Sequence, residues 1–532
     1  MRETHIFLPL LDEMGVLARR DGSRVNTRNF FTTRENKREN KSIQTPRILK
    51  PLWHLGLQRW EEYILRNRLK SSIHVLENSE TGIVFVKEDI SVLTCPHPLK
   101  NSLGEFLEGY PVRTACGRNG ISIDALNDLL LILLKKTESK PTPAADARQE
   151  KILNRLVLNV SHACNLRCRY CYAGGGNYGG SQSLMDRKTA LAVLDTFFRL
   201  FDRVENIQFF GGEPFLNTAI IRFVCSELQK RYQNHEFYEL PHFGVVTNGT
   251  VLTPEIIKLL QDFQFGVTIS VDGPEGVHDY LRGKGTYKRI LRFIRALRKA
   301  GLDFGFESTF TSRHLELGVG LNELMDFFTD EFDLSEVHIP PVALSGEDPL
   351  ALDHDTEKDI YRAAVEYSTD NLLKGKSACL SFAARLMRAY TGEKPVAYYC
   401  PAGFSTLSVD PEGNVFPCFM LTGIEDFTLG NVFDPEFPDP EKSGPITERL
   451  LANEKHNDPE CLQCWASPFC SGCIGADYIK NGRTLTKTKC DVVKSMIEGF
   501  LSKIVCFQDR GHEKLAFGTH EKGGGLSRDI GC

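Results

Sequence analysis

The chain has 532 residues, of which 41% are hydrophobic and 25% charged, and its formal net charge is −5 at pH 7. This length suits two or three domains, and the composition is that of a globular protein. The slightly negative net charge argues against general binding to nucleic acid. The sequence contains no apolar run of about 18 residues, so we expect no membrane span. The N-terminal residues lack the pattern of a secretory signal. The sixteen cysteines therefore indicate metal binding in the cytoplasm rather than disulfides.

The first 150 residues are predicted to form an arm, a small module and a linker. Residues 1–48 are basic, polar and aperiodic, so we expect a mobile arm. A solvated tail is favoured over one that touches nucleic acid or an acidic partner. Residues 49–138 contain two expected short strands within 72–90 and an apolar helix over 121–136. A winged-helix-like module fits these elements, and a plain cap on the next domain is the alternative. Residues 139–150 read as a Pro- and Ala-containing linker.

From residue 151 onward, apolar strands and amphipathic helices alternate six times. This pattern predicts a parallel sheet with right-handed crossovers, in which chemistry gathers at the C-terminal ends of the strands. Helices are expected over 186–201 and 286–300, and Thr253-Pro254-Glu255 is a strong helix start. The expected strands lie at 153–160, 206–210, 243–247, 265–271, 304–310 and 336–342.

Three cysteines follow the first of these strands, with the spacing C-x3-C-x2-C: Cys164, Cys168 and Cys171. Soft thiolates suit iron–sulfur clusters, and three of them can hold a 4Fe–4S cube with one iron left open to a ligand. The spacing alone also suits a zinc knuckle or a structural ferredoxin-type cluster.

This spacing, with Tyr170 just before the third cysteine, resembles the signature of the radical S-adenosylmethionine (SAM) superfamily. The resemblance implies a partial (β/α)6 barrel over 151–375. It also implies that SAM binds the open iron through its amino and carboxylate groups and is cleaved reductively to a 5′-deoxyadenosyl radical.

Polar and glycine residues at the ends of the next three strands extend this resemblance. Glycines let the backbone approach a ligand, a carboxylate can accept the ammonium group of SAM, and an arginine can pair with its carboxylate. Capping of a strand end is the commoner role of each residue alone, but their shared position favours a common ligand. The Ser and Arg of this set resemble SAM-contacting positions of sulfatase maturases. Together with Tyr170, the predicted cofactor-binding residues are Gly211, Gly212, Glu213, Asn248, Ser270 and Arg282.

A second group of cysteines spans 376–505 and resembles the SPASM extension, which holds two auxiliary 4Fe–4S clusters; a pair of zinc ribbons is the alternative. The resemblance assigns the distal cluster to Cys461, Cys464, Cys470 and Cys490. It assigns the proximal cluster to Cys400, Cys418 and Cys473. The usual further ligand before Cys400 is absent. Cys379 is an alternative fourth ligand, but we favour an open iron. Residues 506–532 read as a flexible tail.

Runs such as CYAGGGNYGG and SVDGPEGVHDYLR resemble the peptide maturases that form thioethers, including those of sactipeptides, ranthipeptides and six-cysteine peptides. The resemblance implies an oxidoreductase that crosslinks a cysteine in a ribosomally made precursor peptide. This precursor would carry a leader segment, and the module over 49–138 would recognise that leader. A flavodoxin or ferredoxin would supply electrons, and no membrane or nucleic-acid partner is expected. Carbon–carbon crosslinking, epimerisation, formylglycine formation and non-catalytic electron transfer are the alternatives. Formylglycine formation is disfavoured, because Phe419 stands where sulfatase maturases carry an aspartate.

Overall fold

The computed structural model describes residues 58–77, 81–137, 151–376, 378–392, 398–452, 455, 457–484 and 490–508. Nearly all of these residues belong to one compact unit, Glu61–Cys532. The expected arm over 1–48, the linker over 139–150 and most of the tail over 506–532 lie outside the described residues. None of the described helices is long and apolar enough to span a membrane.

The small N-terminal module is a three-stranded antiparallel sheet with helices around it. Its strands pair in the order β1-β2-β3, and every residue of the apolar β2 segment is buried. The two strands expected within 72–90 are present, whereas β3 was not predicted, because its sequence is short and only weakly alternating. The module has a core of its own, which includes Leu103, Phe106 and Leu133. Its elements are α2 (Gln58–Ser72), β1 (Ile73–Glu77), β2 (Gly82–Val86), β3 (Ser91–Cys95), α3 (His97–Glu108), α4 (Val112–Asn119) and α5 (Ile123–Lys136).

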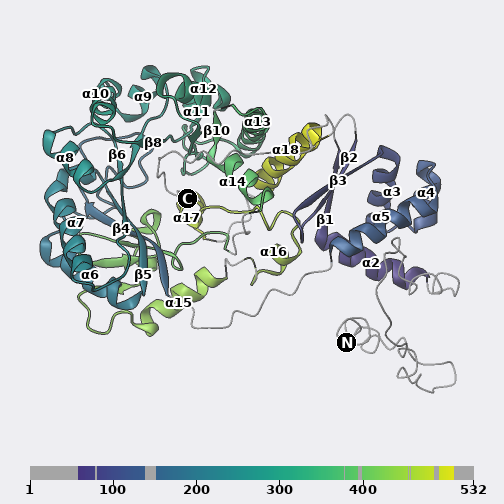
Figure 1. Ribbon diagram of the computed structural model, residues 1–532, viewed down its shortest axis with the longest axis horizontal. Coiled ribbons are helices and arrows are strands. Elements are labelled where there is room, and N and C mark those ends of the chain that lie inside the picture. Colours follow the sequence, from purple (N-terminus) through teal and green to yellow (C-terminus); the bar gives the residue numbers. More distant parts are fainter. Residues whose placement is uncertain are drawn as a thin grey trace. The chain divides into compact units, whose positions relative to one another are not determined.

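Five parallel strands with intervening helices follow, and Figure 1 shows the helices along the outside of these strands. The outward faces of the strands and the inward faces of the helices share one continuous apolar core. This arrangement confirms the predicted α/β class. The strands are β4 (Ile152–Ser161), β5 (Arg203–Gly211), β6 (His242–Thr247), β7 (Gly266–Ser270) and β8 (Phe304–Glu307). The helices are α6 (Arg187–Leu200), α7 (Thr218–Gln233), α8 (Pro254–Asp262), α9 (Glu275–Arg282), α10 (Thr286–Lys299), α11 (Ser312–Glu316) and α12 (Leu321–Phe332), and the short 3-10 helix η3 (Pro214–Asn217) precedes α7.

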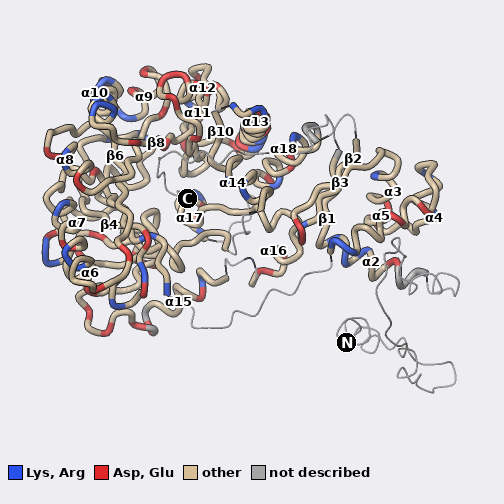
Figure 2. The backbone as a smooth tube through the Cα atoms, in the orientation of Figure 1, with Lys and Arg blue, Asp and Glu red and all other residues tan. Residues whose placement is uncertain are grey.

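Local sequence signals explain where these helices begin and which face they bury. The helix start expected at Thr253 is present, since its hydroxyl accepts a hydrogen bond from the backbone N–H of Ile256 at 3.3 Å. Asp186 caps α6 in the same way. Figure 2 shows the basic residues that α10 carries, while the apolar face of that helix, including Phe293 and Leu297, is buried.

The sixth predicted strand is the main departure from the expected barrel. Only β9 (Glu336–Val337) is regular within 336–342, and it pairs with β10 (Cys379–Leu380) rather than with β8. Isolated parallel bridges join this segment to the last residue of β8 and to the residues after it, from Glu307 to His338 and from Phe310 to Pro341. Pro340 and Pro341 explain the irregularity, because a proline has no backbone N–H to donate to a strand ladder.

Residues from the C-terminal region continue the same sheet on its other side. β11 (Thr406–Val409) pairs in parallel with β4, and β12 (Asn414–Phe416) and β13 (Gly430–Asn431) follow in antiparallel pairing. The sheet order is therefore β13-β12-β11-β4-β5-β6-β7-β8. The remaining helices are α13 (His354–Leu373), α14 (Ser381–Tyr390), α15 (Pro440–Leu451), α16 (Pro459–Gln463), α17 (Ile474–Asn481) and α18 (Cys490–Gln508), with α18 packed along α13.

Candidate active site

A cavity of about 840 Å³ lies inside the parallel strands, at the level of the cysteine loop that leaves β4. The loop cysteines, Cys164, Cys168 and Cys171, all line it, and none of them forms a disulfide. Burial, opposed by the positive charge of Arg282, raises the pKa of the Cys168 thiol to about 11. A soft metal is the kind of ligand that holds such a buried thiol as the thiolate.

Glycines allow the end of β5 and the cysteine loop to pack closely. A Cβ atom on Gly212 would lie 2.4 Å from the carbonyl oxygen of Ala163, and one on Gly176 would lie 2.9 Å from Cβ of Cys164. Gly176 also has a φ of +98°, which favours glycine. The backbone at Gly176 and Gly212 therefore packs so closely around Cys164 that a side chain at either position would not fit. Gly211 and Gly212 also line the cavity.

Glu213 is placed differently from the other predicted SAM residues. It is fully buried, and it is not among the residues that line the cavity. Its carboxylate accepts hydrogen bonds from the hydroxyl of Thr247 at 2.8 Å, the N–H of Asn248 at 2.9 Å and the N–H of Phe215 at 3.1 Å. Burial, opposed by these bonds, raises the pKa of Glu213 to about 7. In this structure the carboxylate ties the ends of β5 and β6 together.

Asn248 and Ser270 line the cavity, as expected of residues that face a bound ligand. The amide nitrogen of Asn248 lies 3.8 Å from the sulfur of Cys164 and donates to Oδ1 of Asn165 at 2.9 Å. Its amide oxygen accepts from the hydroxyl of Thr250 at 2.6 Å. These bonds fix the orientation of the Asn248 side chain next to the cysteine loop.

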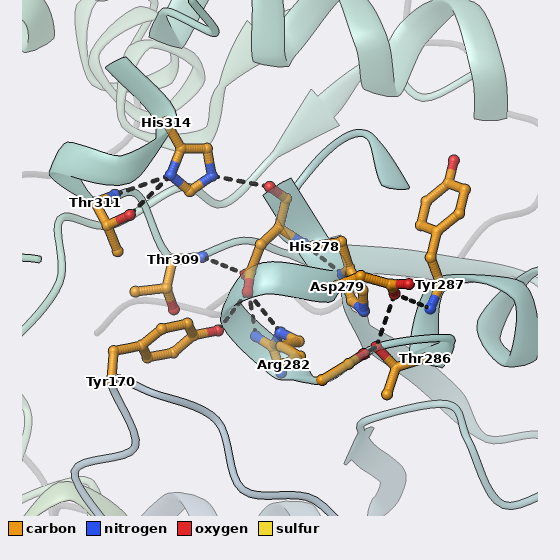
Figure 3. Close-up of polar contacts among 11 residues, drawn as sticks. Tyr170, His278, Asp279, Arg282, Thr286, Tyr287, Thr309, Thr311 and His314 are labelled. Carbon is orange, nitrogen blue, oxygen red and sulfur yellow. Dashed lines mark hydrogen bonds and ion pairs between the residues drawn. The ribbon is translucent and has the colours of Figure 1, made fainter. Parts of the chain in front are cut away.

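Asp272 is a central residue that the sequence analysis missed. Its carboxylate pairs with Arg282 through two contacts of 2.7 and 3.1 Å and accepts from the hydroxyl of Tyr170 at 2.7 Å (Figure 3). The N–H of Thr309 donates to the same carboxylate at 3.1 Å, and His314 contacts the backbone oxygen of Asp272 at 2.8 Å. The position directly after the Ser270-Val271 strand end was the available sequence signal.

The fully buried Asp272 neutralises Arg282 and so fixes two of the predicted SAM residues. Burial would raise the pKa of Asp272, but the Arg282 charge and hydrogen bonds hold it below its usual value. Arg282 and Tyr170 both line the cavity, and both are held by the same carboxylate. The geometry therefore supplies an oriented guanidinium and an oriented aromatic ring next to the cysteine loop.

The second group of cysteines separates into two sets in space. Burial and the neighbouring thiols of Cys473 and Cys400 raise the pKa of Cys418. Cys473 lines the cavity, as do Phe419 and Met420. These three cysteines are the set predicted for a proximal cluster.

The other set surrounds Cys470. Burial raises the pKa of Cys470 to about 12, opposed by Lys455 and assisted by the thiols of Cys490, Cys464 and Cys461. Among the described residues, no three Cys, His, Asp or Glu side chains are arranged around a single metal ion. A donor set made only of thiols, each able to bind a separate iron, nevertheless suits an iron–sulfur cube.

Cys379 stands apart from both sets. It is 3% exposed, and its thiol donates to the carbonyl oxygen of Ser335 at 3.2 Å. Burial, together with the negative charge of Glu336, raises its pKa to about 12. It therefore behaves as a small buried hydrophobe with a weak donor.

Replacing Cys379 with Ala is expected to leave the iron content of the protein unchanged, because this thiol faces a backbone oxygen and not the other cysteines. Iron and acid-labile sulfide analysis of the reconstituted protein measures this directly. Cys418→Ala is the matched comparison and should lose iron. Loss of about one cluster of iron from Cys379→Ala would instead make Cys379 the fourth ligand.

Comparisons with known proteins agree with this site. Residues 158–315 match the radical SAM superfamily, and residues 400–465 match SPASM, an iron–sulfur cluster-binding domain. The cysteine-type anaerobic sulfatase-maturating enzyme of Clostridium novyi is 25% identical, over 66% of this chain and 96% of that protein. The antilisterial bacteriocin subtilosin biosynthesis protein AlbA of Bacillus subtilis is 25% identical, over 60% of this chain and 66% of that protein.

An uncharacterized protein of Methanocaldococcus jannaschii is 31% identical over 31% of this chain, and the match spans about half of that relative, 55% of its length. Among solved structures, native anSMEcpe with bound AdoMet superposes with a TM-score of 0.56 at 19% identity, over 67% of this chain and all of that one. That likeness is one of fold. The cofactors are S-adenosylmethionine and 4Fe–4S clusters, since the first match is to the radical SAM superfamily and the second to an iron–sulfur cluster-binding domain. The cavity brings the cysteine loop and the oriented polar residues together. The chain thus carries a radical SAM domain followed by a SPASM iron–sulfur domain, and its homologues include a sulfatase-maturating enzyme and a bacteriocin biosynthesis protein.

Proposed function

We propose that this protein modifies a ribosomally made peptide by hydrogen abstraction and forms a thioether between a substrate cysteine and a second residue. The observation that carries this proposal is that both cysteine sets reach the same cavity. Cys164, Cys168 and Cys171 line it, and so does Cys473. A substrate held in this space would face both cysteine sets.

Residues in different parts of the cavity would have different roles. Cys164, Cys168 and Cys171 would hold the cluster that binds SAM, and Cys400, Cys418 and Cys473 would hold the proximal auxiliary cluster. When bound, these groups supply a 5′-deoxyadenosyl radical and an iron position for a thiolate. Asp272 holds Arg282 and Tyr170 in place through bonds of 2.7 Å. The contribution of the protein is orientation, which can lower a barrier by about 7–11 kcal/mol for well-aligned partners.

Phe419 supports thioether formation over formylglycine formation. Its ring packs 4.7 Å from that of Phe210, and both rings line the cavity. An aromatic ring cannot accept the proton that formylglycine formation removes from the substrate. Carbon–carbon crosslinking and epimerisation need the same cavity and remain the runner-up reactions.

The reaction is tested with reconstituted protein, SAM, dithionite and the product of a short cysteine-rich reading frame next to the gene. Thioether formation would release 5′-deoxyadenosine and leave the peptide lighter by two hydrogen atoms. A non-catalytic electron carrier would release no 5′-deoxyadenosine. Release of 5′-deoxyadenosine with an unchanged peptide mass would point to epimerisation.

We further assign leader recognition to the module over 49–138, which has a separate core and a complete sheet of its own. Its deletion is expected to lower turnover of leader-containing peptide by about tenfold or more, since the loss of one modest binding contribution of about 1.4 kcal/mol has this effect. SAM cleavage without peptide should fall far less. The two rates are measured side by side by chromatography, and equal losses would favour a plain structural cap. A flavodoxin or ferredoxin is the reductant we expect in the cell.

A further inference from the structure

A second charged region lines the same cavity away from the predicted SAM residues. It comprises Arg155 on β4, His338 after β9, and Arg385 in the middle of α14. We call these three residues and the N-terminus of α14 the basic floor. None of them belongs to the cysteine motifs or to the predicted SAM set.

Arg155 carries a buried hydrogen-bond donor that lacks an acceptor. It is 9% exposed, and its Nε has no hydrogen-bond partner among the described residues. Its guanidinium lies 5.8 Å from the ring centroid of Phe419, which also lines the cavity. A buried donor of a charged group that lacks an acceptor is costly, so an acceptor from a bound molecule would remove an existing penalty.

His338 lines the cavity together with Arg155 and Arg385. Burial, with the positive charges of Arg385 and Arg155, lowers the pKa of His338 to about 4. The imidazole is therefore neutral, and its Nδ1 lies 2.9 Å from the hydroxyl of Ser381, the first residue of α14. His338 therefore adds no positive charge of its own to this part of the cavity lining.

The start of α14 adds a partial positive charge. This helix spans ten residues, its N-cap Leu380 provides no side-chain cap, and Ser381 and Phe382 line the cavity. First-turn N–H groups of such a helix favour a negative ligand. Together with the unpartnered Nε of Arg155, this adds backbone donors to the lining of the same cavity.

Two carboxylates line the same cavity, and neither of them forms an ion pair with Arg155. Glu357 is paired with Lys480 at 3.3 Å. Glu307 lies on the same wall, where its pKa is raised by burial and lowered by Arg282 and Arg155, but no ion pair joins it to Arg155. Glu336 faces Arg385 through its negative charge, so the acceptor that is missing among the described residues is the one for Nε of Arg155.

We propose that the basic floor binds a carboxylate of the substrate peptide, and so selects peptides that carry an acidic group near the modified position. This inference rests on the proposed peptide-modifying function and names the chemistry that the peptide must present. Arginine suits this role, because its planar fork can pair with both oxygens of a carboxylate.

The test is calorimetric binding of blocked tripeptides to the reconstituted protein with SAM and without reductant, so that no turnover occurs. The probes are acetylated and amidated alanyl-glutamyl-alanine, its glutamine counterpart, and acetylated trialanine as free acid or amide. A charge-assisted hydrogen bond predicts about tenfold or greater preference for glutamate over glutamine. A preference for the free acid of trialanine alone would assign the site to a C-terminal carboxylate.

Arg155→Met should bring the glutamate-to-glutamine ratio close to one while the affinity for the glutamine peptide stays constant. Arg155→Lys should keep part of the preference. Arg292→Met, on the exposed side of α10, is the matched control and should behave as wild type. Iron content and circular dichroism check the fold, and Arg385→Met decides the question if Arg155→Met does not fold.

Equal binding of all four probes by the wild type would overturn the proposal, as would an unchanged ratio in Arg155→Met. Failure of the proposed function looks different, because it appears as absent 5′-deoxyadenosine under reducing conditions. Selective binding without reductant, combined with no 5′-deoxyadenosine after dithionite is added, would keep the carboxylate site and reject the reaction.

Discussion

Replacing Cys164, Cys168 and Cys171 together with Ala should reduce 5′-deoxyadenosine formation to background. The three thiols all line one cavity, and a cube that loses its ligands cannot present an iron to SAM. The auxiliary cysteines lie elsewhere in the chain, so the variant should keep the iron of the remaining clusters. Chromatography of the nucleoside product and iron analysis of the same sample measure both effects.

Cys225→Ala is the matched control for this triple variant. Cys225 is a fully buried thiol of α7 and does not line the cavity. Its loss should affect stability slightly and leave SAM cleavage intact. Continued 5′-deoxyadenosine formation by the triple variant would reject the assignment of these cysteines.

Asp272→Asn should be among the most destabilising single substitutions in the barrel. Asp272 is fully buried and Arg282 is 8% exposed, so the variant leaves a buried guanidinium without its counter-charge. Removing one partner of a buried ion pair costs about 3–5 kcal/mol. Urea unfolding followed by circular dichroism would detect this as a lower midpoint.

The pH dependence of this contribution has a definite sign. The pKa of Asp272 is lower in the folded protein than its ordinary value, so the stabilisation is present above the unfolded pKa of about 3.9. It is lost as the pH falls through the folded value. Asp262→Asn is the matched control, because its ion pairs with Arg222 and Lys258 lie on the surface and surface pairs contribute little. Equal midpoints for the two variants would contradict a central role for Asp272.

Features with a strong local signal could be predicted from the sequence. The cysteine spacings, the helix start at Thr253 and the alternation of strands and helices each depend on neighbouring residues. The irregular sixth strand was also readable in principle, because Pro340 and Pro341 stand within the expected range 336–342.

Features that depend on contacts between distant loops could not be predicted. Asp272 acquires its role from Tyr170, Arg282 and His314, which come from separate segments and meet in the folded chain. Glu213 was expected to face a ligand, but three donors from neighbouring strand ends surround its carboxylate. The four-residue β11 has no sequence feature that reveals its partner.

The pairing of β11 with β4 has a consequence for the newly synthesised chain. Arg155 pairs with Thr406 and Leu158 with Val409, so this side of β4 is covered by residues made about 250 positions later. At about 5–20 residues per second, the strand edge waits on the order of ten to fifty seconds for its partner on the ribosome. An unpaired apolar edge is a template for aggregation. We therefore expect the nascent chain to depend on chaperones during this interval. We also expect slower ribosomal synthesis of the residues between β4 and β11 to lower the yield of folded protein.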